Sequence, residues 1–176
     1  MTLLIRNAKI TGIDQLERLL RHAKHFEFVE LTLDILRVLR LQYSTVDGDI
    51  EKYEAIKKQY YEYEQIWLME SKAEFYYSEL MAQYTNSKST KTEVMDQAKA
   101  YYSELEGFMK ECPSFKLHLF GRMVHLLIYN SVNDYVNTAR HCEDAIAFFD
   151  KKEYDSGLPL QVFYYNLVVC YLQLGE

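Results

Sequence analysis

Hydrophobic residues recur at steps of three and four along most of the chain, from Leu16 to Leu174. This spacing places apolar side chains on one face of an α-helix, and polar residues fill the opposite face. No segment shows the period-two alternation of a β-strand. The pattern therefore predicts an all-α protein of about seven helices. We expect them over residues 11–26, 28–43, 49–84, 90–111, 115–131, 135–152 and 159–174.

The residues between these stripes predict where the helices begin and end. Two pairs of polar residues have the spacing of side chains that bond the free amides at a helix start: Thr11 with Asp14, and Thr90 with Glu93. Pro113 ends a helix and Ser114 caps the next one. Pro159 suits a first helical turn, where its missing amide hydrogen costs nothing. Short connections at 25–27 and 133–134 predict antiparallel hairpins, whereas 85–92 is a polar linker and 155–159 a loop.

The stretch from Ile50 to Tyr84 contains neither proline nor glycine, so it predicts one helix of about 35 residues. Its apolar residues form two stripes that are rotated relative to each other. We therefore expect the two ends of this helix to contact different neighbours, or the helix to be kinked near 70–71. From Asp47 to Tyr84 there are nine acidic and four basic side chains, a net charge of -5.

Composition narrows the class of protein. The chain has 176 residues, of which 49% are hydrophobic, and this fraction excludes an intrinsically disordered chain. No apolar run approaches the roughly 18 residues of a membrane span, and the start of the chain lacks the pattern of a signal peptide. Three cysteines are too few for a disulfide framework. We therefore expect a cytoplasmic protein with no membrane partner.

The last third of the chain resembles the tetratricopeptide repeat family. The residues that carry this resemblance are Tyr164, Leu167, Val168, Tyr171, Leu174 and Gly175, preceded by Leu126, Tyr129, Asn133, Tyr135, Thr138, Cys142, Ala145 and Ile146. Asn133 stands where the family prefers a glycine, and asparagine tolerates a left-handed turn. Ala145 stands where adjacent helices approach closely and only a small side chain fits.

Two features depart from the family pattern. The turns at Asn133 and Gly175 are 42 residues apart (175 − 133), compared with about 34 in the family. Leu126 and Val168 stand where the family usually has Gly or Ala. The resemblance, clearest over 119–176, implies a right-handed α-α superhelix of antiparallel hairpins. It implies one repeat domain over 1–176, or the N-terminal part of a longer array.

The helix predicted at 159–174 is apolar nearly all round. Val162, Tyr165, Val169 and Leu172 lie off the stripe formed by Tyr164, Leu167 and Tyr171. An end helix of a repeat array normally has a polar outer face. We therefore expect either that the array continues or that this C-terminal helix is buried in a homo-oligomer.

Motifs for catalysis and for cofactor binding are absent from the sequence. It has no HExxH, CxxC, Walker A, GxSxG or GxGxxG pattern. His22 and His25 are three apart on one helix but lack a clear third ligand for a metal. His118 and His125 share a helix face near Cys142, which we interpret as a small buried hydrophobe. We predict no enzyme activity, no cofactor and no metal site.

Sixteen tyrosines raise the question of nucleic-acid stacking. Many of them lie in the most acidic segment, where phosphate is repelled. Arg18, Arg21 and Arg37 belong to a basic N-terminal hairpin, which we interpret as a solvated face. We therefore interpret the tyrosines as residues of helix interfaces and expect no nucleic-acid partner.

The resemblance implies a protein-interaction or scaffolding module that binds a peptide or helical segment of a partner. It assigns the binding face to Met123, Leu127, Asn130, Val162, Tyr165, Asn166, Val169 and Gln173. Asn166 stands where such domains commonly bond a ligand, and the alternative is that it bonds a neighbouring helix. The alternative functions are a peptide-sensing regulatory domain of a larger regulator and a self-associating structural protein.

Overall fold

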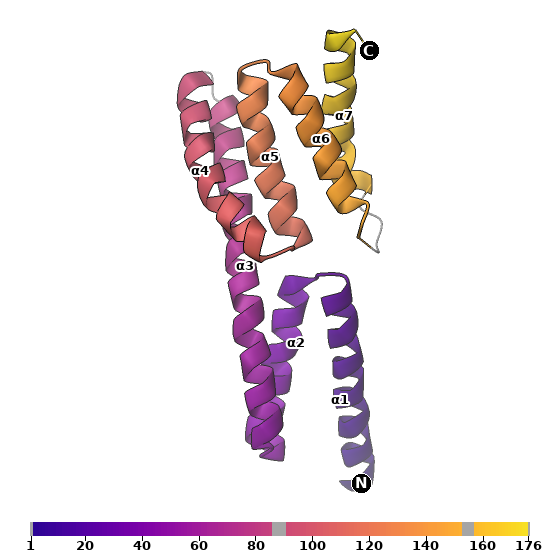
Figure 1. Ribbon diagram of the computed structural model, residues 1–176. Helices are drawn as coiled ribbons and strands as arrows, with labels where there is room; N and C mark the ends of the chain where they lie inside the picture. The colour runs from indigo at the N-terminus through magenta and orange to yellow at the C-terminus, as the bar shows by residue number, and fades with distance from the viewer. Residues whose placement is uncertain (1, 86–90, 153–156, 176) are drawn as a thin grey trace. The chain divides into compact units, whose positions relative to one another are not determined.

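A computed structural model describes residues 2–85, 91–152 and 157–175, and in these ranges it contains no β-strand (Figure 1). Its elements are α1 (Thr2–His25), α2 (Val29–Leu41), the π-helical η1 (Gln42–Asp47), α3 (Ile50–Thr85), α4 (Lys91–Glu111), α5 (Phe115–Ser131), α6 (Tyr135–Phe149) and α7 (Gly157–Leu174). The predicted all-α class is confirmed, as are seven α-helices in the described ranges. Contacts divide the chain into two compact units, Met1–Leu68 and Met69–Glu176, and each is described by itself.

Several predicted boundaries need correction. Helix α1 begins at Thr2, so Thr11 lies within it and does not cap its start. Gly12 is tolerated there because one glycine in a helix costs only about 1 kcal/mol. Helix α6 ends at Phe149 instead of 152, where the N–H of Lys152 turns back to the carbonyl of Phe149 at 2.9 Å. Helix α7 begins at Gly157, so the predicted loop at 155–159 is wrong over 157–159. Thr90 of the predicted capping pair, residues 155–156 and most of the linker lie outside the described residues.

The start of α5 follows its sequence signals closely. Ser114 Oγ accepts a hydrogen bond from the N–H of Leu117 at 3.4 Å, so this residue is the predicted N-cap. The same hydroxyl donates a short hydrogen bond to the carboxylate of Glu70, which is only 3% exposed. A carboxylate at this end is stabilised by the helix dipole. The buried Glu70 therefore ties α3 to the start of α5.

Two hairpins turn through the same backbone geometry. Glu27, after α1, and Asn133, after α5, both have a φ of +55°. In each case the next residue, Phe28 or Asp134, donates its N–H to the carbonyl five residues back, at 2.8 and 3.2 Å. This is the Schellman pattern, in which the left-handed residue closes the helix end. The left-handed turn expected at Asn133 is confirmed, and Gly175 has a φ of +80°.

The left-handed conformation of Glu27 predicts how a substitution there changes the stability of the fold. A side chain in the left-handed region costs about 1 kcal/mol that glycine does not incur. We expect Glu27→Gly to raise the free energy of unfolding by about 0.5–1 kcal/mol in a urea titration. The matched control is Glu30→Gly in the first turn of α2, which should lower it by a similar amount. A loss of stability in both variants would contradict the proposed strain at Glu27.

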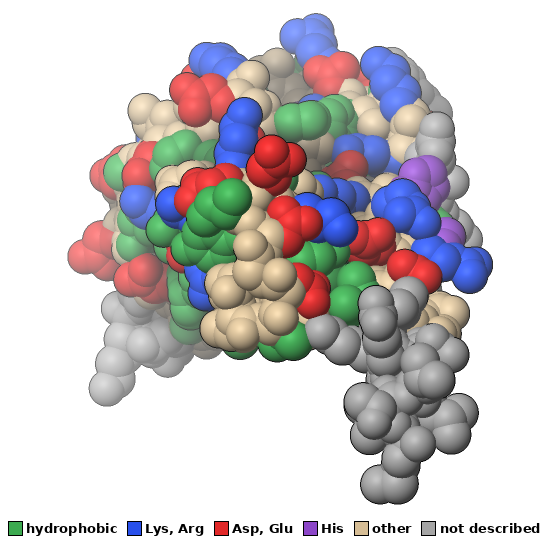
Figure 2. Space-filling view, turned by 90° about the horizontal axis from the view of Figure 1, so that it is seen from below, with side chains coloured by type: hydrophobic (Ala, Val, Ile, Leu, Met, Phe, Trp, Pro, Cys, Tyr) green, Lys and Arg blue, Asp and Glu red, His purple; other side chains and the backbone are tan. Residues whose placement is uncertain are grey.

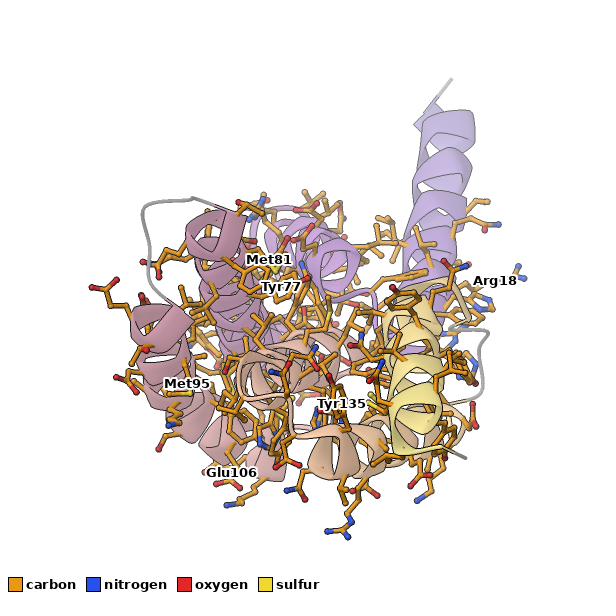
Figure 3. The ribbon with its side chains drawn as sticks, turned by 90° about the horizontal axis from the view of Figure 1, so that it is seen from above. Arg18, Tyr77, Met81, Met95, Glu106 and Tyr135 are labelled. Carbon is orange, nitrogen blue, oxygen red and sulfur yellow. The ribbon has the colours of Figure 1, made fainter. Side chains whose placement is uncertain are left out.

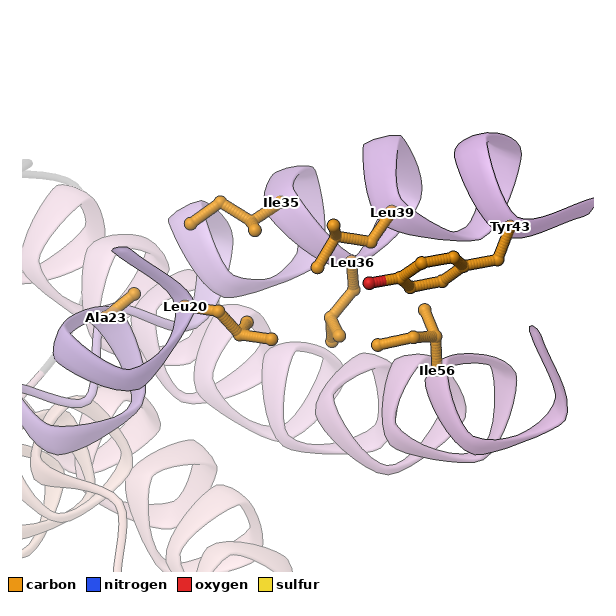
Figure 4. Close-up of a cluster of buried hydrophobic side chains, with 7 residues drawn as sticks. All are labelled: Leu20, Ala23, Ile35, Leu36, Leu39, Tyr43 and Ile56. Carbon is orange, nitrogen blue, oxygen red and sulfur yellow. The ribbon is translucent and has the colours of Figure 1, made fainter. Parts of the chain in front are cut away.

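The core of the first unit is formed by α1, α2 and the first half of α3. Its buried side chains are Leu20, Ala23, Ile35, Leu36, Leu39, Tyr43 and Ile56 (Figure 4). The hydroxyl of Tyr43 donates to Glu17 at 2.7 Å. Burial, followed by this carboxylate, raises the pKa of Tyr43 well above its usual value. The ring therefore fills the core while its hydroxyl keeps a polar partner.

The second half of α3 contacts α4 and α5 within the second unit. The ring of Tyr76 stacks on that of Tyr101 of α4, with centroids 3.7 Å apart. The ring of Tyr77 lies 5.7 Å from that of Phe120 of α5. Met81 lies one helical turn beyond Tyr77 (Figure 3). The two ends of α3 thus contact different neighbours, which confirms that prediction for a helix that stays continuous from Ile50 to Thr85.

Candidate interaction surface on helices α5 and α7

Helices α5, α6 and α7 follow one another across the second unit (Figure 1). They share a buried cluster that consists of Leu126, Cys142, Ala145, Phe149, Leu160 and Phe163. Ala145 is fully buried within it, as the close approach of helices at this position requires. This cluster fixes the rotation of α5 and α7 about their own axes, and so decides which side chains each helix presents to solvent.

The buried stripe of α7 is displaced by one position from the predicted one. Leu160, Phe163 and Cys170 are buried and Leu167 is half-buried. Tyr164, which the sequence placed on the stripe, is exposed. Tyr171 is half-buried, and its hydroxyl donates to Glu143 of α6 at 2.5 Å. The prediction failed here because α7 is apolar nearly all round, and its periodicity does not single out one face.

The predicted binding residues lie on α5 and α7 with different exposures. Met123, Leu127, Val162, Asn166 and Val169 are half-buried, whereas Asn130, Tyr165 and Gln173 are exposed. Both Met123 and Val162 pack against the shared cluster. The structure directly joins one pair from the two helices, Asn130 and Asn166.

Asn166 links the two helices through its side-chain amide. Its Oδ1 accepts a hydrogen bond from Nδ2 of Asn130 at 3.0 Å, and its own Nδ2 donates to the carbonyl of Val162 at 2.7 Å. The bond to a neighbouring helix, one of the two alternatives for this residue, is therefore present. An amide offers two donor hydrogens and two acceptor lone pairs. The pair therefore retains hydrogen-bonding capacity for a ligand.

A row of apolar side chains on α7 is exposed, and the sequence had already placed two of them, Tyr165 and Leu172, off the predicted stripe. Tyr165 and Leu172 are each 72% exposed, and Val168 is 57% exposed. Helix α7 contains no Asp, Glu, Lys, Arg or His. An exposed helix normally has a charged or polar face. The apolar character of this helix was noted from the sequence, whereas the exposure of Val168 was not.

A cluster of buried and half-buried ionisable side chains also escaped prediction. On α5, the ring of His118 stacks on Phe148 of α6 at 4.1 Å, and the guanidinium of Arg122 lies 5.0 Å from the same ring. The ring of His125 lies 3.8 Å from Tyr102 and 4.6 Å from His141. His118 and His125 were noted in the sequence as two residues of one helix face, but their burial was not.

Burial controls the pKa values in this cluster. Desolvation is the main cause that lowers the pKa of His118 and of His125 to about 4, and the charge of Arg122 adds to it. Burial also raises the pKa of the Cys142 thiol to about 12, so this thiol is protonated at neutral pH. Thiolate is the reactive form of cysteine. The arrangement thus keeps Cys142 as an inert, small apolar side chain.

The rest of the described chain gives few sites for other chemistry. In residues 2–85, 91–152 and 157–175, no three His, Cys, Asp or Glu side chains converge as metal ligands. No described helix is long and apolar enough to cross a lipid bilayer. Acidic and basic side chains are interspersed with hydrophobic ones on the face that Figure 2 shows.

Comparison of the chain with protein-family models, with curated proteins and with solved structures found no match.

Proposed function

We propose that the protein is an interaction module that binds a peptide or helical segment of a partner protein along α5 and α7. One observation carries this proposal: the amides of Asn130 and Asn166 are joined at 3.0 Å beside the exposed Tyr165 and Gln173. Amide side chains bond a peptide backbone, because they both donate and accept. Tyrosine supplies a large apolar contact with a polar tip.

The repeated hairpin geometry supports a tetratricopeptide-like stacking of the second unit. Alternate helices contact each other in order along it. Glu74 of α3 forms an ion pair with Lys116 of α5 at 2.7 Å, and Asn130 of α5 bonds Asn166 of α7 at 3.0 Å. In such a stack the first helices of successive hairpins form one continuous surface, which suits an extended ligand.

The chemistry of this surface defines the kind of partner. The binding residues on α5 and α7 are apolar, aromatic or amide-bearing, and none of them carries a charge. We therefore propose a segment with hydrophobic anchors instead of a highly acidic tail. We propose the cytoplasm as the place of action, because three cysteines, all of them buried, are too few for the disulfide framework of a small secreted protein.

A photocrosslinking experiment tests the surface. A benzophenone amino acid at position 173 should crosslink the chain to a partner in cells, and mass spectrometry identifies the product. The matched control carries the same probe at position 140, an exposed site on α6. We expect Asn166→Ala to reduce the yield from position 173 at least threefold, because it removes the amide pair. Identical products from both sites, or an unchanged yield with Asn166→Ala, would remove this surface from consideration.

Two alternative functions lead to different experimental results. A peptide-sensing regulatory domain would require an effector domain to which it is attached. A self-associating structural protein would give a crosslinked product of twice the chain mass. The exposed apolar row of α7 favours the second alternative as an additional property of the chain.

A further inference from the structure

The rings of Tyr76 and Tyr101 form a close parallel pair between α3 and α4, within the second unit. Their centroids are 3.7 Å apart, and their planes differ by only 3°. By comparison, the rings of the consecutive residues Tyr60 and Tyr61 lie 6.2 Å apart at an angle of 79°. Aromatic rings normally pack offset or edge to face, because the faces of both rings carry negative partial charge. A close face-to-face contact therefore needs other interactions that hold the two rings in place.

Hydrogen bonds to two carboxylates supply those interactions. The hydroxyl of Tyr76 donates to Oε2 of Glu104 on α4 at 2.6 Å, and the hydroxyl of Tyr101 donates to Oε2 of Glu79 on α3 at 2.8 Å. Each tyrosine is thus bonded to the helix that carries the other one. Gln97 also donates to the hydroxyl of Tyr101, at 2.6 Å. The two rings are therefore fixed against each other by bonds that cross between the helices.

The two carboxylates are also placed to accept a proton from each phenol. A general base must lie within about 2.6–3.2 Å of the atom that gives up its proton, and both contacts meet this requirement. Hydrogen bonds from Lys72 and Tyr76 lower the pKa of Glu104, so this carboxylate is ionised at neutral pH. Burial, followed by the bond to the carboxylate, raises the pKa of Tyr76 and of Tyr101. Both phenols therefore keep their protons until an electron is removed from the ring.

We propose that Tyr76 and Tyr101 are a site of oxidative modification, at which a one-electron oxidant generated from hydrogen peroxide couples the two rings into dityrosine. Each phenol gives one electron to the oxidant and its hydroxyl proton to the bonded carboxylate, which leaves a neutral phenoxyl radical. The two radicals form a carbon–carbon bond between ring positions next to the oxygens. Each bonded carbon then loses its hydrogen as a proton, and each oxygen regains one. The chain thus loses two electrons and two protons, which reduce one hydrogen peroxide to two waters.

Accessibility and geometry together favour this pair over a more exposed tyrosine. Both rings are half-buried, so a small oxidant reaches them while the helices hold them in contact. Glu79 and Glu104 are exposed and pass the protons on to water. Tyr61 is 53% exposed, but its ring stands nearly perpendicular to that of Tyr60. Those two rings are therefore not in position to couple, although the oxidant reaches Tyr61 easily.

Oxidation of the full chain tests the site. A dilute sample is treated with a small haem peptide and hydrogen peroxide, and dityrosine is measured by its blue fluorescence. Mass spectrometry should find a monomeric chain that has lost two hydrogen atoms and is linked between residues 76 and 101. We expect Tyr76→Phe and Tyr101→Phe each to lower the monomeric yield about tenfold or more, since phenylalanine has no hydroxyl to oxidise. The matched control, Tyr61→Phe, should not change this yield.

Replacement of a carboxylate tests the transfer of the proton. Glu104→Gln keeps an acceptor for the hydroxyl of Tyr76 but cannot take up its proton, so we expect crosslinking to slow about threefold or more. Glu106→Gln is the control, because Glu106 is exposed on α4 and pairs with Lys110. An equal rate in these two variants would overturn the proposed proton transfer.

The remaining outcomes decide between this site and general tyrosine oxidation. Circular dichroism checks that every variant folds, and none of them alters the proposed binding surface on α5 and α7. Equal yields from the Tyr76→Phe and Tyr61→Phe chains would overturn the proposal. A wild-type chain that forms dityrosine only between separate molecules would overturn it as well.

Discussion

Replacement of Phe149 by alanine is expected to destabilise the protein by about 3–5 kcal/mol. Phe149 is fully buried, and its ring contacts those of Phe115 and Phe163 at centroid distances of 4.8 and 6.2 Å. It therefore joins α5, α6 and α7 at one point of the shared cluster. The loss combines the transfer free energy of the ring with the cavity that it leaves. Chemical denaturation monitored by circular dichroism measures the change.

The matched control for this variant is Phe75→Ala. Phe75 lies in the second half of α3 and is 72% exposed, so the same chemical change there should cost less than about 0.5 kcal/mol. Equal losses in the two variants would mean that Phe149 does not hold the three helices together.

Acidification from pH 7 to pH 5 should remove several kcal/mol of stability. The pKa of both His118 and His125 is lowered to about 4 in the folded chain, against an ordinary value of 6.5. Below pH 6.5 the unfolded chain binds protons that the folded chain does not, so stability falls until the pH reaches the folded pKa near 4. At pH 5 each histidine contributes a loss of about 1–2 kcal/mol.

The interval from pH 7 to pH 5 reports mainly on the histidines, because the ordinary pKa values of carboxylates lie lower, near 4. We expect His125→Gln to reduce the difference in unfolding free energy between pH 7 and pH 5 by about 1–2 kcal/mol. His22→Gln is the control, since His22 is exposed on α1, and it should leave that difference unchanged. A wild-type chain with equal stability at the two pH values would show that these imidazoles are not buried as neutral groups.

Local signals in the sequence were sufficient to predict most of the fold. The hydroxyl of Ser114 next to Pro113 predicted the start of α5, and Asn133 predicted a left-handed turn, because both effects act within a few residues. Glu27 has the same left-handed conformation without any such signal in its side chain. Packing imposes this conformation, because α1 and α2 must fold back within three residues.

The buried polar residues could not be predicted from spacing alone. Glu70 was noted only as part of a suspected kink, yet it is buried against the hydroxyl of Ser114. This contact joins residues 44 positions apart, and no periodic pattern encodes it. Likewise, the burial of His125 depends on Tyr102 and His141, which come from two other helices.

The helices that carry the candidate binding residues were predictable from the sequence, and the binding role of these residues stays a prediction. Asn130 and Asn166 were both named from the family resemblance, and the structure joins them directly. Which residues of α7 are exposed was harder to predict, because this helix is apolar nearly all round and its periodicity does not single out one face. Its rotation became evident only from Phe163 and Cys170, which are buried.

Helix α3 belongs to both compact units, and this has a consequence for measurements of local opening. Up to Leu68 the side chains of this helix pack with α1 and α2. From Met69 onward they pack with α4 and α5. Amide hydrogen exchange follows the opening of the packed unit around each backbone N–H. Exchange rates measured along this one helix therefore give the opening free energies of both cores.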